Sequence, residues 1–170
     1  MWLSQGTYDR MQARQYAERW WNSANPSFRY FDDNCTNFVS QCMLAGGFPM
    51  DDRGRQDAGW WYRGDGGAQD RWSYSWAVAH SLYWYLAGGG TSIPVSEVAM
   101  PQQLQIGDVI CYDWSGNGRW GHTTIVTGHD PSGEPLVAAQ TANSFNRPWQ
   151  YLDSHAHTPE TRYKFFHIGK

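Results

Sequence analysis

No stretch of this sequence is long and apolar enough to suggest a membrane-spanning helix, which requires ~20 consecutive apolar residues. The first residues also lack the basic and apolar parts of a signal peptide. We therefore expect no membrane span. The sequence leaves the cellular location open, because a longer exported parent protein would place this chain outside the cell or at the cell wall.

Charged residues are scarce as well, and they form no run of one sign. They make up 17% of the chain, with 13 Lys and Arg residues against 16 Asp and Glu residues and a formal net charge of -3. Proteins that bind DNA or RNA concentrate positive charge to displace counterions from the phosphates. We therefore expect no nucleic-acid partner.

Only three cysteines are present, Cys35, Cys42 and Cys111. An odd number leaves at least one thiol unpaired in any disulfide scheme, so we expect packing to hold the core and one free thiol to need a role. The chain also has no internal repeat, no low-complexity tract and no Pro/Ser-rich linker. We therefore treat residues 1–170 as one domain, large enough to bury roughly 70% of its unfolded surface, and we expect a monomer.

Aromatic residues, in contrast, are abundant. The 11 Trp, 10 Tyr and 7 Phe residues account for 16% of the chain, which excludes a disordered tail. Trp60 and Trp61 lie in a segment rich in Gly, Asp, Arg and Trp, residues 51–72, and Trp120 lies further along. We consider these three residues candidates for a substrate groove that binds peptide or sugar. Packing in the core or within a loop explains them at least as well.

Apolar residues at helical spacing predict three helices, over residues 7–21, 34–45 and 75–86. After residue 101 the pattern changes from helical to extended. Runs of β-branched and aromatic residues then predict four strands, over residues 106–112, 122–128, 136–141 and 163–168. Helices followed by strands of this kind indicate an α+β fold.

The segment 129–133 has the composition of a hairpin turn. We therefore expect the two strands that flank it to pair antiparallel. The pairing would be centred near position 131.5, which places residue 141 opposite residue 122.

Cys35 is the candidate nucleophile. It follows short polar residues of the helix N-cap type, Asp33 and Asn34, and precedes the apolar residues of a predicted helix. A thiol at this position faces the positive end of the helix dipole and the N–H groups of the first turn, which favour the thiolate and can stabilise an oxyanion. Without other context, burial in the core is the more common role of a cysteine. We assign that role to Cys42 and Cys111.

A thiolate nucleophile needs a base, and His122 is the best placed of the 6 histidines. It begins a predicted strand directly after a turn-forming segment, so its imidazole is expected at the end of the sheet. A catalytic histidine also needs an acceptor that orients its second ring nitrogen. Gln140 and Asn143 are the candidates for this third catalytic position. We favour Gln140, because it lies within one residue of the expected partner of His122.

Four blocks occur in order along the chain: Cys35 to Gly47, Gly107 to Asp113, Gly121 to Thr127, and Asn143-Ser with Arg147 and Trp149. Together they resemble the "Putative amidase domain" family of Gram-positive bacteria, which is related to the NlpC-type and CHAP-type cysteine peptidases of papain-like fold. The resemblance extends from about residue 8 to residue 168, which is practically the whole chain.

The resemblance implies a papain-like fold in which a cysteine-bearing helix packs on an antiparallel β-sheet. It also implies that Cys35 is the nucleophile, that His122 is the base, and that a polar residue on the next strand orients the base. Two positions depart from the family pattern. Asn34 stands where the family usually has Asp, with Asp33 one step earlier, and Gln140 stands where a histidine is common. We expect Asn34 and Asp33 to support the nucleophile and the oxyanion.

The favoured interpretation is a cysteine amidase or peptidase that cleaves an amide bond in peptidoglycan or a related bacterial cell-wall peptide. Two alternatives remain. One is a non-catalytic module that binds cell-wall polymer, and the other is an acyltransferase or transpeptidase that uses the same Cys-His pair. We expect no cofactor and no metal, because no set of His, Cys and carboxylate residues has dependable ligand spacing.

Overall fold

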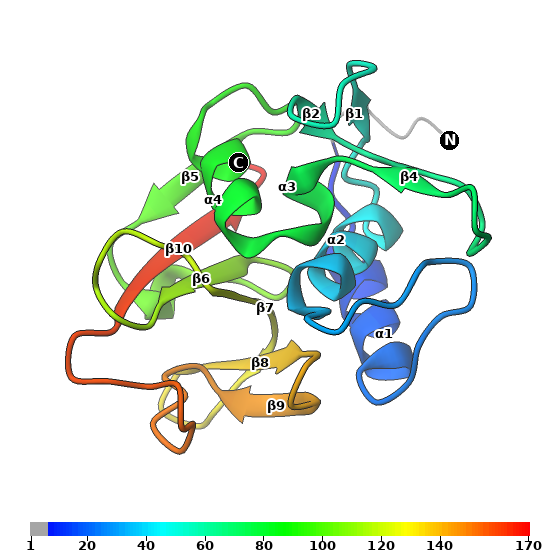
Figure 1. The fold of residues 1–170 in the computed structure, drawn as a ribbon. Coiled ribbons are helices and arrows are strands. Elements are labelled where there is room, and N and C mark those ends of the chain that lie inside the picture. The colour runs from blue at the N-terminus through cyan, green and yellow to red at the C-terminus, as the bar shows by residue number, and fades with distance from the viewer. Residues whose placement is uncertain (1–6) are drawn as a thin grey trace.

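The computed structural model describes residues 7–170, and its main feature is a six-stranded antiparallel sheet (Figure 1). In their order across the sheet, the strands are β5 (Val95–Val98), β10 (Arg162–Ile168), β6 (Val109–Asp113), β7 (His122–His129), β8 (Pro135–Ala139) and β9 (Ser144–Pro148). The helices are α1 (Arg10–Trp20), α2 (Cys35–Ala45), α3 (Tyr74–Ala77) and α4 (Ala79–Ala87). The expected α+β class is confirmed.

Smaller elements lie outside this sheet. They are the pair β1 (Asp51–Asp52) and β2 (Gly59–Trp60), the pair β3 (Tyr62–Arg63) and β4 (Arg71–Trp72), and the short 3-10 helix η1 (Pro101–Gln103). The segment 51–72 is therefore an ordered loop with two short hairpins.

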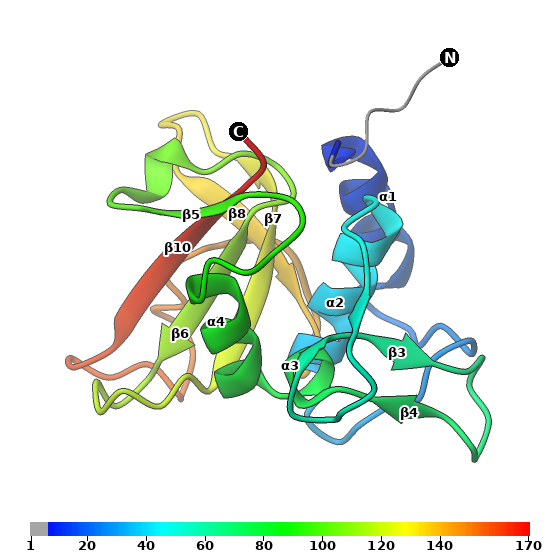
Figure 2. The same ribbon diagram turned by 90° about the horizontal axis from the view of Figure 1, so that it is seen from above.

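Helices α1, α2 and α4 lie on one face of the sheet (Figure 2). Helix α2 is the most buried of them, with nine of its 11 residues buried. Its residues Phe38, Val39 and Cys42 share one apolar core with Ile125 of β7. Burial on all sides fixes the position of α2, and therefore of the cysteine that begins it. None of the helices in residues 7–170 is long and apolar enough to cross a membrane.

The predicted helix over residues 75–86 is in fact two helices. Val78 separates α3 from α4 with an extended backbone, φ -119° and ψ 123°. Its N–H donates to the carbonyl of Tyr74, and its own carbonyl accepts from the N–H of Leu82. One residue therefore ends the first helix and begins the second. The spacing of the apolar residues continues across this break, which is why it predicted a single helix.

Strands β7 and β8 form the predicted hairpin. Ile125 pairs with Ala138 and Val126 pairs with Val137, which is the register expected from a centre near 131.5, and a bulge follows Val126. Strand β8 ends at Ala139, earlier than predicted, because Thr141 and Ala142 adopt positive φ values of 39° and 57° and turn the chain into β9.

The opposite face of the sheet is also buried. Its apolar cluster includes Tyr112 of β6 and Val126 of β7, together with Trp149 and Tyr151 from the segment that follows β9. Side chains alternate between the two faces of a strand. His122 therefore lies on the same face as Val126, and its ring contacts that of Tyr112.

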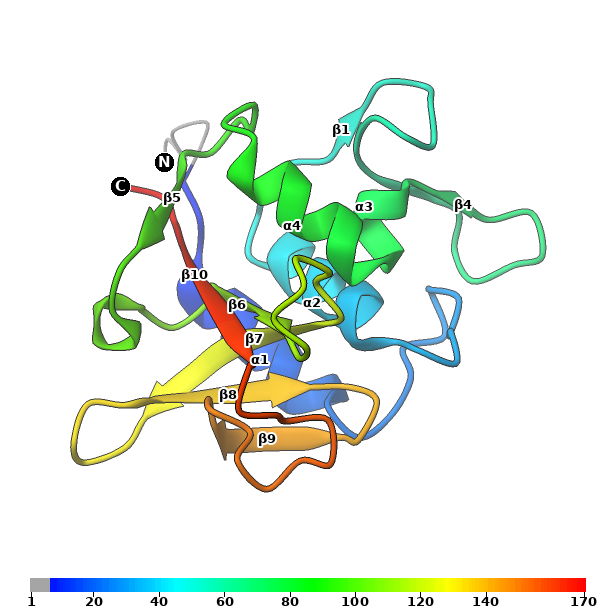
Figure 3. The same ribbon diagram turned by 60° about the vertical axis from the view of Figure 1, so that its left-hand side comes forward.

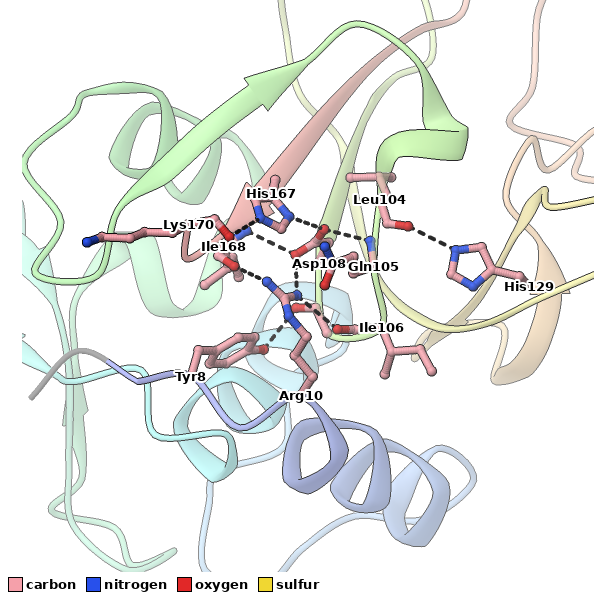
Figure 4. Close-up of polar contacts among 11 residues, drawn as sticks. Tyr8, Arg10, Leu104, Gln105, Ile106, Asp108, His129, His167, Ile168 and Lys170 are labelled. Atoms are coloured by element: carbon pink, nitrogen blue, oxygen red, sulfur yellow. Dashed lines mark hydrogen bonds and ion pairs between the residues drawn. The ribbon is translucent and has the colours of Figure 1, made fainter. Parts of the chain in front are cut away.

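The buried carboxylate of Asp108 joins three parts of the fold (Figure 4). It accepts hydrogen bonds from the Arg10 guanidinium at 2.7 Å and the Gln105 N–H at 2.8 Å. It also accepts from His167 Nδ1 at 2.8 Å and the Ile168 N–H at 2.9 Å. The start of α1, the turn before β6 and the end of β10 are thereby held together.

Replacing Asp108 by Ala is expected to lower the free energy of unfolding by about 3–5 kcal/mol, because Arg10 and His167 lose their buried acceptor. Urea denaturation followed by circular dichroism measures the change. Asp57→Ala is the control, since Asp57 forms an exposed ion pair with Arg55, and it should leave the midpoint nearly unchanged. Similar midpoints for the two variants would contradict the role of Asp108.

Candidate active site

Cys35 is the first residue of α2, and the N–H groups of the first turn are not capped by a side chain. Asn34 occupies the N-cap position, but its side chain points elsewhere. Its Oδ1 accepts from the N–H of Phe31 and from Nδ2 of Asn37, both at 2.9 Å. The first-turn N–H groups therefore remain available to an oxygen that develops negative charge next to Cys35.

The Cys35 thiol is 2% exposed and donates to Oδ1 of Asp33 at 3.4 Å. Burial, and next the negative charge of Asp33, raise the pKa of Cys35 to about 12, although hydrogen bonds from Thr36 and from the backbone of Thr123 lower it. The expectation of a resting thiolate is therefore wrong for this structure. The helix N-terminus is present, but burial and a neighbouring carboxylate have the larger effect.

His122 begins β7 and is 8% exposed. Its ring lies among aromatic side chains, stacked on Trp114 at 5.6 Å and tilted against Tyr151 at 5.0 Å between ring centroids. Nε2 is buried and has no hydrogen-bond partner among residues 7–170. Burial lowers the pKa of His122 to about 3, and the positive charge of Arg147 contributes in the same direction. The imidazole is therefore neutral at physiological pH.

The structure brings Cys35 and His122 to the same end of β7 without a hydrogen bond between them. The backbone N–H of Thr123, the residue after His122, lies next to the Cys35 sulfur. Tyr151 lies beside both residues, since its ring contacts that of His122 and a charge on Cys35 would raise the pKa of Tyr151. The hydrogen bond expected for a catalytic pair is therefore not formed in this structure.

Gln140 holds the start of α2 and does not contact His122. Its Oε1 accepts from Nδ2 of Asn34 at 2.6 Å. Its Nε2 donates to the carbonyls of Trp20 at 2.6 Å and Ser23 at 2.9 Å. These contacts do not support the orienting role that we expected. The reason is that β8 ends before Gln140, so the Gln140 side chain points toward the end of α1 and the start of α2.

Asn143 is exposed on the turn between β8 and β9. It lines a shallow cleft of about 280 Å³ together with Asn22, Tyr30 and Gln140. The structure shows no contact between Asn143 and His122. Neither candidate for the third catalytic position therefore lies at the base.

The tryptophans considered for a substrate groove are buried. Trp60, Trp61 and Trp120 are 0%, 1% and 6% exposed, so packing accounts for all three. Trp120 belongs to the loop between β6 and β7, which lies beside α4 (Figure 3), and its ring stacks on Tyr83 at 4.3 Å.

An open apolar cleft lies next to Cys35 instead. It has a volume of about 370 Å³ and is lined by Phe31, Asp33, Thr36, Trp72, Tyr74, Ala77, Val78 and Ala79. Two of these residues, Asp33 and Thr36, are the ones whose side chains contact the sulfur. The cleft therefore offers a place for an apolar group beside the thiol.

Arg147 and Tyr151 were not among the residues selected from the sequence, yet they surround His122. The guanidinium carbon of Arg147 lies 3.8 Å from the centroid of the Tyr151 ring. Arg147 belongs to the fourth of the sequence blocks described above, and this could have indicated a role at the site. Tyr151 reaches the site through a turn in which its own φ is 58°, and no sequence pattern indicated this.

Comparison with known proteins places these residues in a family. The family model described as "Putative amidase domain" matches residues 7–166. The chain belongs to this family. It is 50% identical to the uncharacterized protein YhbB of Bacillus subtilis (strain 168) over 161 residues, 95% of this chain and 50% of YhbB. It is 28% identical to the uncharacterized protein YjcM of the same organism over 155 residues, 86% of this chain and 34% of YjcM.

This amidase domain thus spans about half the length of YhbB and about a third of YjcM. The search of solved structures found no match.

The reactivity of Cys35 toward iodoacetamide is expected to rise with pH. The midpoint of this rise should lie above pH ~8.5, the pKa of a free thiol, because burial and the charge of Asp33 raise the pKa of Cys35. Asp33→Asn removes the nearby negative charge and should move the midpoint to lower pH. Asp32→Asn is the control, since Asp32 is not among the groups that shift the pKa of Cys35. Peptide mapping after alkylation at several pH values measures each thiol. A midpoint unaffected by Asp33→Asn would be inconsistent with this arrangement.

Gln140→Ala is expected to lower the free energy of unfolding by about 1–3 kcal/mol, because the buried amide of Asn34 and the half-buried carbonyl of Trp20 lose their partner. Asn143→Ala, at an exposed position on the same turn, should change stability little. Thermal and urea unfolding of the two variants test this. An unchanged stability for Gln140→Ala would mean that these hydrogen bonds do not hold the site.

Proposed function

We propose that this domain is a cysteine-dependent amidase in which Cys35 attacks the amide carbonyl and His122 transfers the proton. The observation that carries the proposal is the position of Cys35, at the uncapped start of α2 and beside the strand that begins with His122. Membership of an amidase domain family agrees with cleavage of an amide bond. Cysteine chemistry is supported by this placement of the thiol.

The first half of the reaction forms the acyl-enzyme. His122 accepts the thiol proton as the Cys35 sulfur bonds to the carbonyl carbon, and the carbonyl oxygen becomes an oxyanion next to the first-turn N–H groups of α2. The C–N bond then breaks as His122 returns the proton to the leaving amine. Because the pKa of Cys35 is raised and that of His122 is lowered, the free protein starts from the neutral thiol and the neutral imidazole.

The second half of the reaction consumes one water molecule. His122 accepts a proton from the water as its oxygen bonds to the acyl carbon, and the S–C bond breaks. The released acyl group leaves as a carboxylic acid, and the sulfur regains a proton from His122. One amide bond and one water molecule thus yield one amine and one acid.

The surrounding residues position the nucleophile. Asp33 accepts the hydrogen of the thiol and so directs the sulfur. Asn34 is fixed by Gln140 and by the N–H of Phe31, which holds the start of α2 in place. In this proposal Asp33, Asn34 and Gln140 are positioning residues, and the base is oriented by the aromatic side chains around it.

The proposed fold is papain-like, of the NlpC and CHAP type. The support is a cysteine-bearing helix packed on an antiparallel sheet, with a histidine at the start of the adjacent strand. The proposed substrate is a peptide amide of peptidoglycan or a related bacterial cell-wall peptide. The apolar cleft beside Cys35 is large enough to hold one side chain of such a peptide.

Digestion of defined peptidoglycan fragments tests the function, with mass spectrometry of the products. The domain should release fragments with one new amine and one new carboxylic acid. Cys35→Ala should abolish the release, and His122→Gln should slow it by about 100- to 10,000-fold. Cys42→Ala is the matched control, because Cys42 lies further along α2 in the core, and it should retain activity.

Three results would contradict the proposal. Full activity of Cys35→Ala would exclude the nucleophile. Binding of the fragments without cleavage by the unmodified domain would indicate a binding module. Transfer of the acyl group to added glycine methyl ester in place of water would indicate an acyltransferase.

A further inference from the structure

Three buried polar atoms without a hydrogen-bond partner lie close together in the described part of the chain. They are His122 Nε2, Arg147 Nε and the Tyr151 hydroxyl. The Tyr151 ring lies 5.0 Å from the His122 ring and 3.8 Å from the guanidinium carbon of Arg147. A buried polar group without a partner destabilises the folded protein, and native proteins contain few of them. Ser144 and Arg147 lie near the Tyr151 hydroxyl and lower its pKa, which burial raises, but neither completes a hydrogen bond to it. Three such atoms in one cluster, next to the proposed base, point to a ligand.

Arg147 is held so that its Nε remains unpaired. Its Nη1 donates to Ser144 Oγ at 3.2 Å, and its Nη2 donates to Asp153 Oδ1 at 2.8 Å. The Asp153 side chain is 78% exposed, whereas that of Arg147 is 17% exposed. The partly buried guanidinium is thus paired on one side with a solvated carboxylate, and its Nε–H faces the interior.

The chemistry of the cluster selects an anionic oxygen ligand. Arg147 Nε and the Tyr151 hydroxyl are both donors, and the guanidinium carries a permanent positive charge. The groups that face His122 are Arg147 from β9, Tyr151 from the segment after it, and Tyr112 and Trp114 from β6 and its end. None of these is acidic, so a neutral ligand would leave the positive charge of Arg147 without a buried counter-ion.

We propose that Arg147 and Tyr151 bind a carboxylate of the substrate, close to the amide bond that Cys35 attacks. This inference rests on the proposed function and narrows its substrate class to amides that carry a free carboxylate near the bond that is cleaved. Arginine and tyrosine donors form strong charge-assisted hydrogen bonds to such a group.

The same contact affects the base. His122 must become positively charged when it accepts the thiol proton, and the guanidinium of Arg147 opposes this charge. A carboxylate bound between them cancels the opposition and raises the pKa of His122. The substrate thereby supplies a negative charge that stabilises protonated His122, a charge that the residues facing His122 do not supply in the free protein.

In this proposal the ligand enters between the two loop segments that carry Trp114 and Tyr151. Trp114 and Tyr151 belong to the segments 114–121 and 149–161, which contain no helix or strand. Such segments shift more readily than the strands that they join.

Binding of N-acetylalanine to the Cys35→Ala protein tests the proposal, with N-acetylalaninamide as the uncharged probe. Nuclear magnetic resonance of ¹⁵N-labelled histidine reports the His122 ring and its pKa. N-acetylalanine should cause a saturable shift and raise the pKa of His122, whereas the carboxamide should do neither at equal concentration and ionic strength. Equal responses to the two probes, or no response to either, would overturn the proposal.

Variants identify the donors. Arg147→Gln should weaken binding of N-acetylalanine by about tenfold or more, and Tyr151→Phe should weaken it by a smaller factor. Asp153→Asn changes an exposed residue and removes the competing carboxylate, so it should strengthen binding. Arg55→Gln is the matched control, because Arg55 is also an arginine paired with an aspartate but lies on the surface. Binding that is unchanged in both Arg147→Gln and Asp153→Asn would overturn the assignment.

The test separates the two proposals, because the Cys35→Ala protein has no thiol at the site. Carboxylate binding with no cleavage of any amide by the unmodified domain would remove the proposed function and keep the binding site. Cleavage without carboxylate binding would remove the proposed binding site and keep the proposed function.

Discussion

Helix α1 is anchored at both ends, and the position of Cys35 depends on this constraint. At its start, Arg10 donates to the buried carboxylate of Asp108, which also binds the end of β10. At its end, the carbonyls of Trp20 and Ser23 accept from Gln140, which in turn accepts from Asn34. Cys35, the proposed nucleophile, therefore begins α2 at a point fixed by hydrogen bonds at both ends of α1.

The Asp108 carboxylate and the cluster next to His122 are two polar centres of the molecule, and they differ in how completely their polar atoms are hydrogen-bonded. The carboxylate of Asp108 is fully buried, and four donors satisfy its oxygens. In the cluster of His122, Arg147 and Tyr151, two residues are buried and Arg147 is half-buried, and one buried polar atom on each residue is unpaired. Complete pairing is typical of a structural centre, whereas buried polar atoms left unpaired require an explanation, of which a catalytic role or a bound partner is one. This contrast supports the placement of function at His122.

The sequence predicted the parts of this fold that depend on local periodicity. Helix α2 and strand β7 have apolar patterns with periods of about 3.6 and 2 residues, and the turn between β7 and β8 determined their register. Strand β9 was missed because its residues, Ser144–Pro148, are largely polar and lie at the edge of the sheet. Edge strands of this kind carry little apolar pattern.

The environment of the site was harder to predict. Gln140 was expected within one residue of the position opposite His122, which required the strand to continue to residue 141. Thr141 and Ala142 instead adopt the left-handed conformation without being glycine, and β8 ends at Ala139. The pKa of Cys35 depends on burial as well as on the helix dipole, and burial is a property of the whole fold. Arg147 and Tyr151 reach His122 through tertiary packing, which no local pattern records.

The pKa shifts of Cys35 and His122 have the same main cause, which is burial. Burial raises the pKa of Cys35 and lowers that of His122, so it suppresses transfer of the proton from sulfur to imidazole in the free protein. Solvent that reaches the site would lower the pKa of Cys35 and raise that of His122, which moves the two values toward each other. A negative charge beside Arg147 acts most directly on His122, because it compensates the guanidinium. Burial therefore keeps the thiol of the free protein protonated, and access of solvent would favour the proton transfer that the proposed reaction requires.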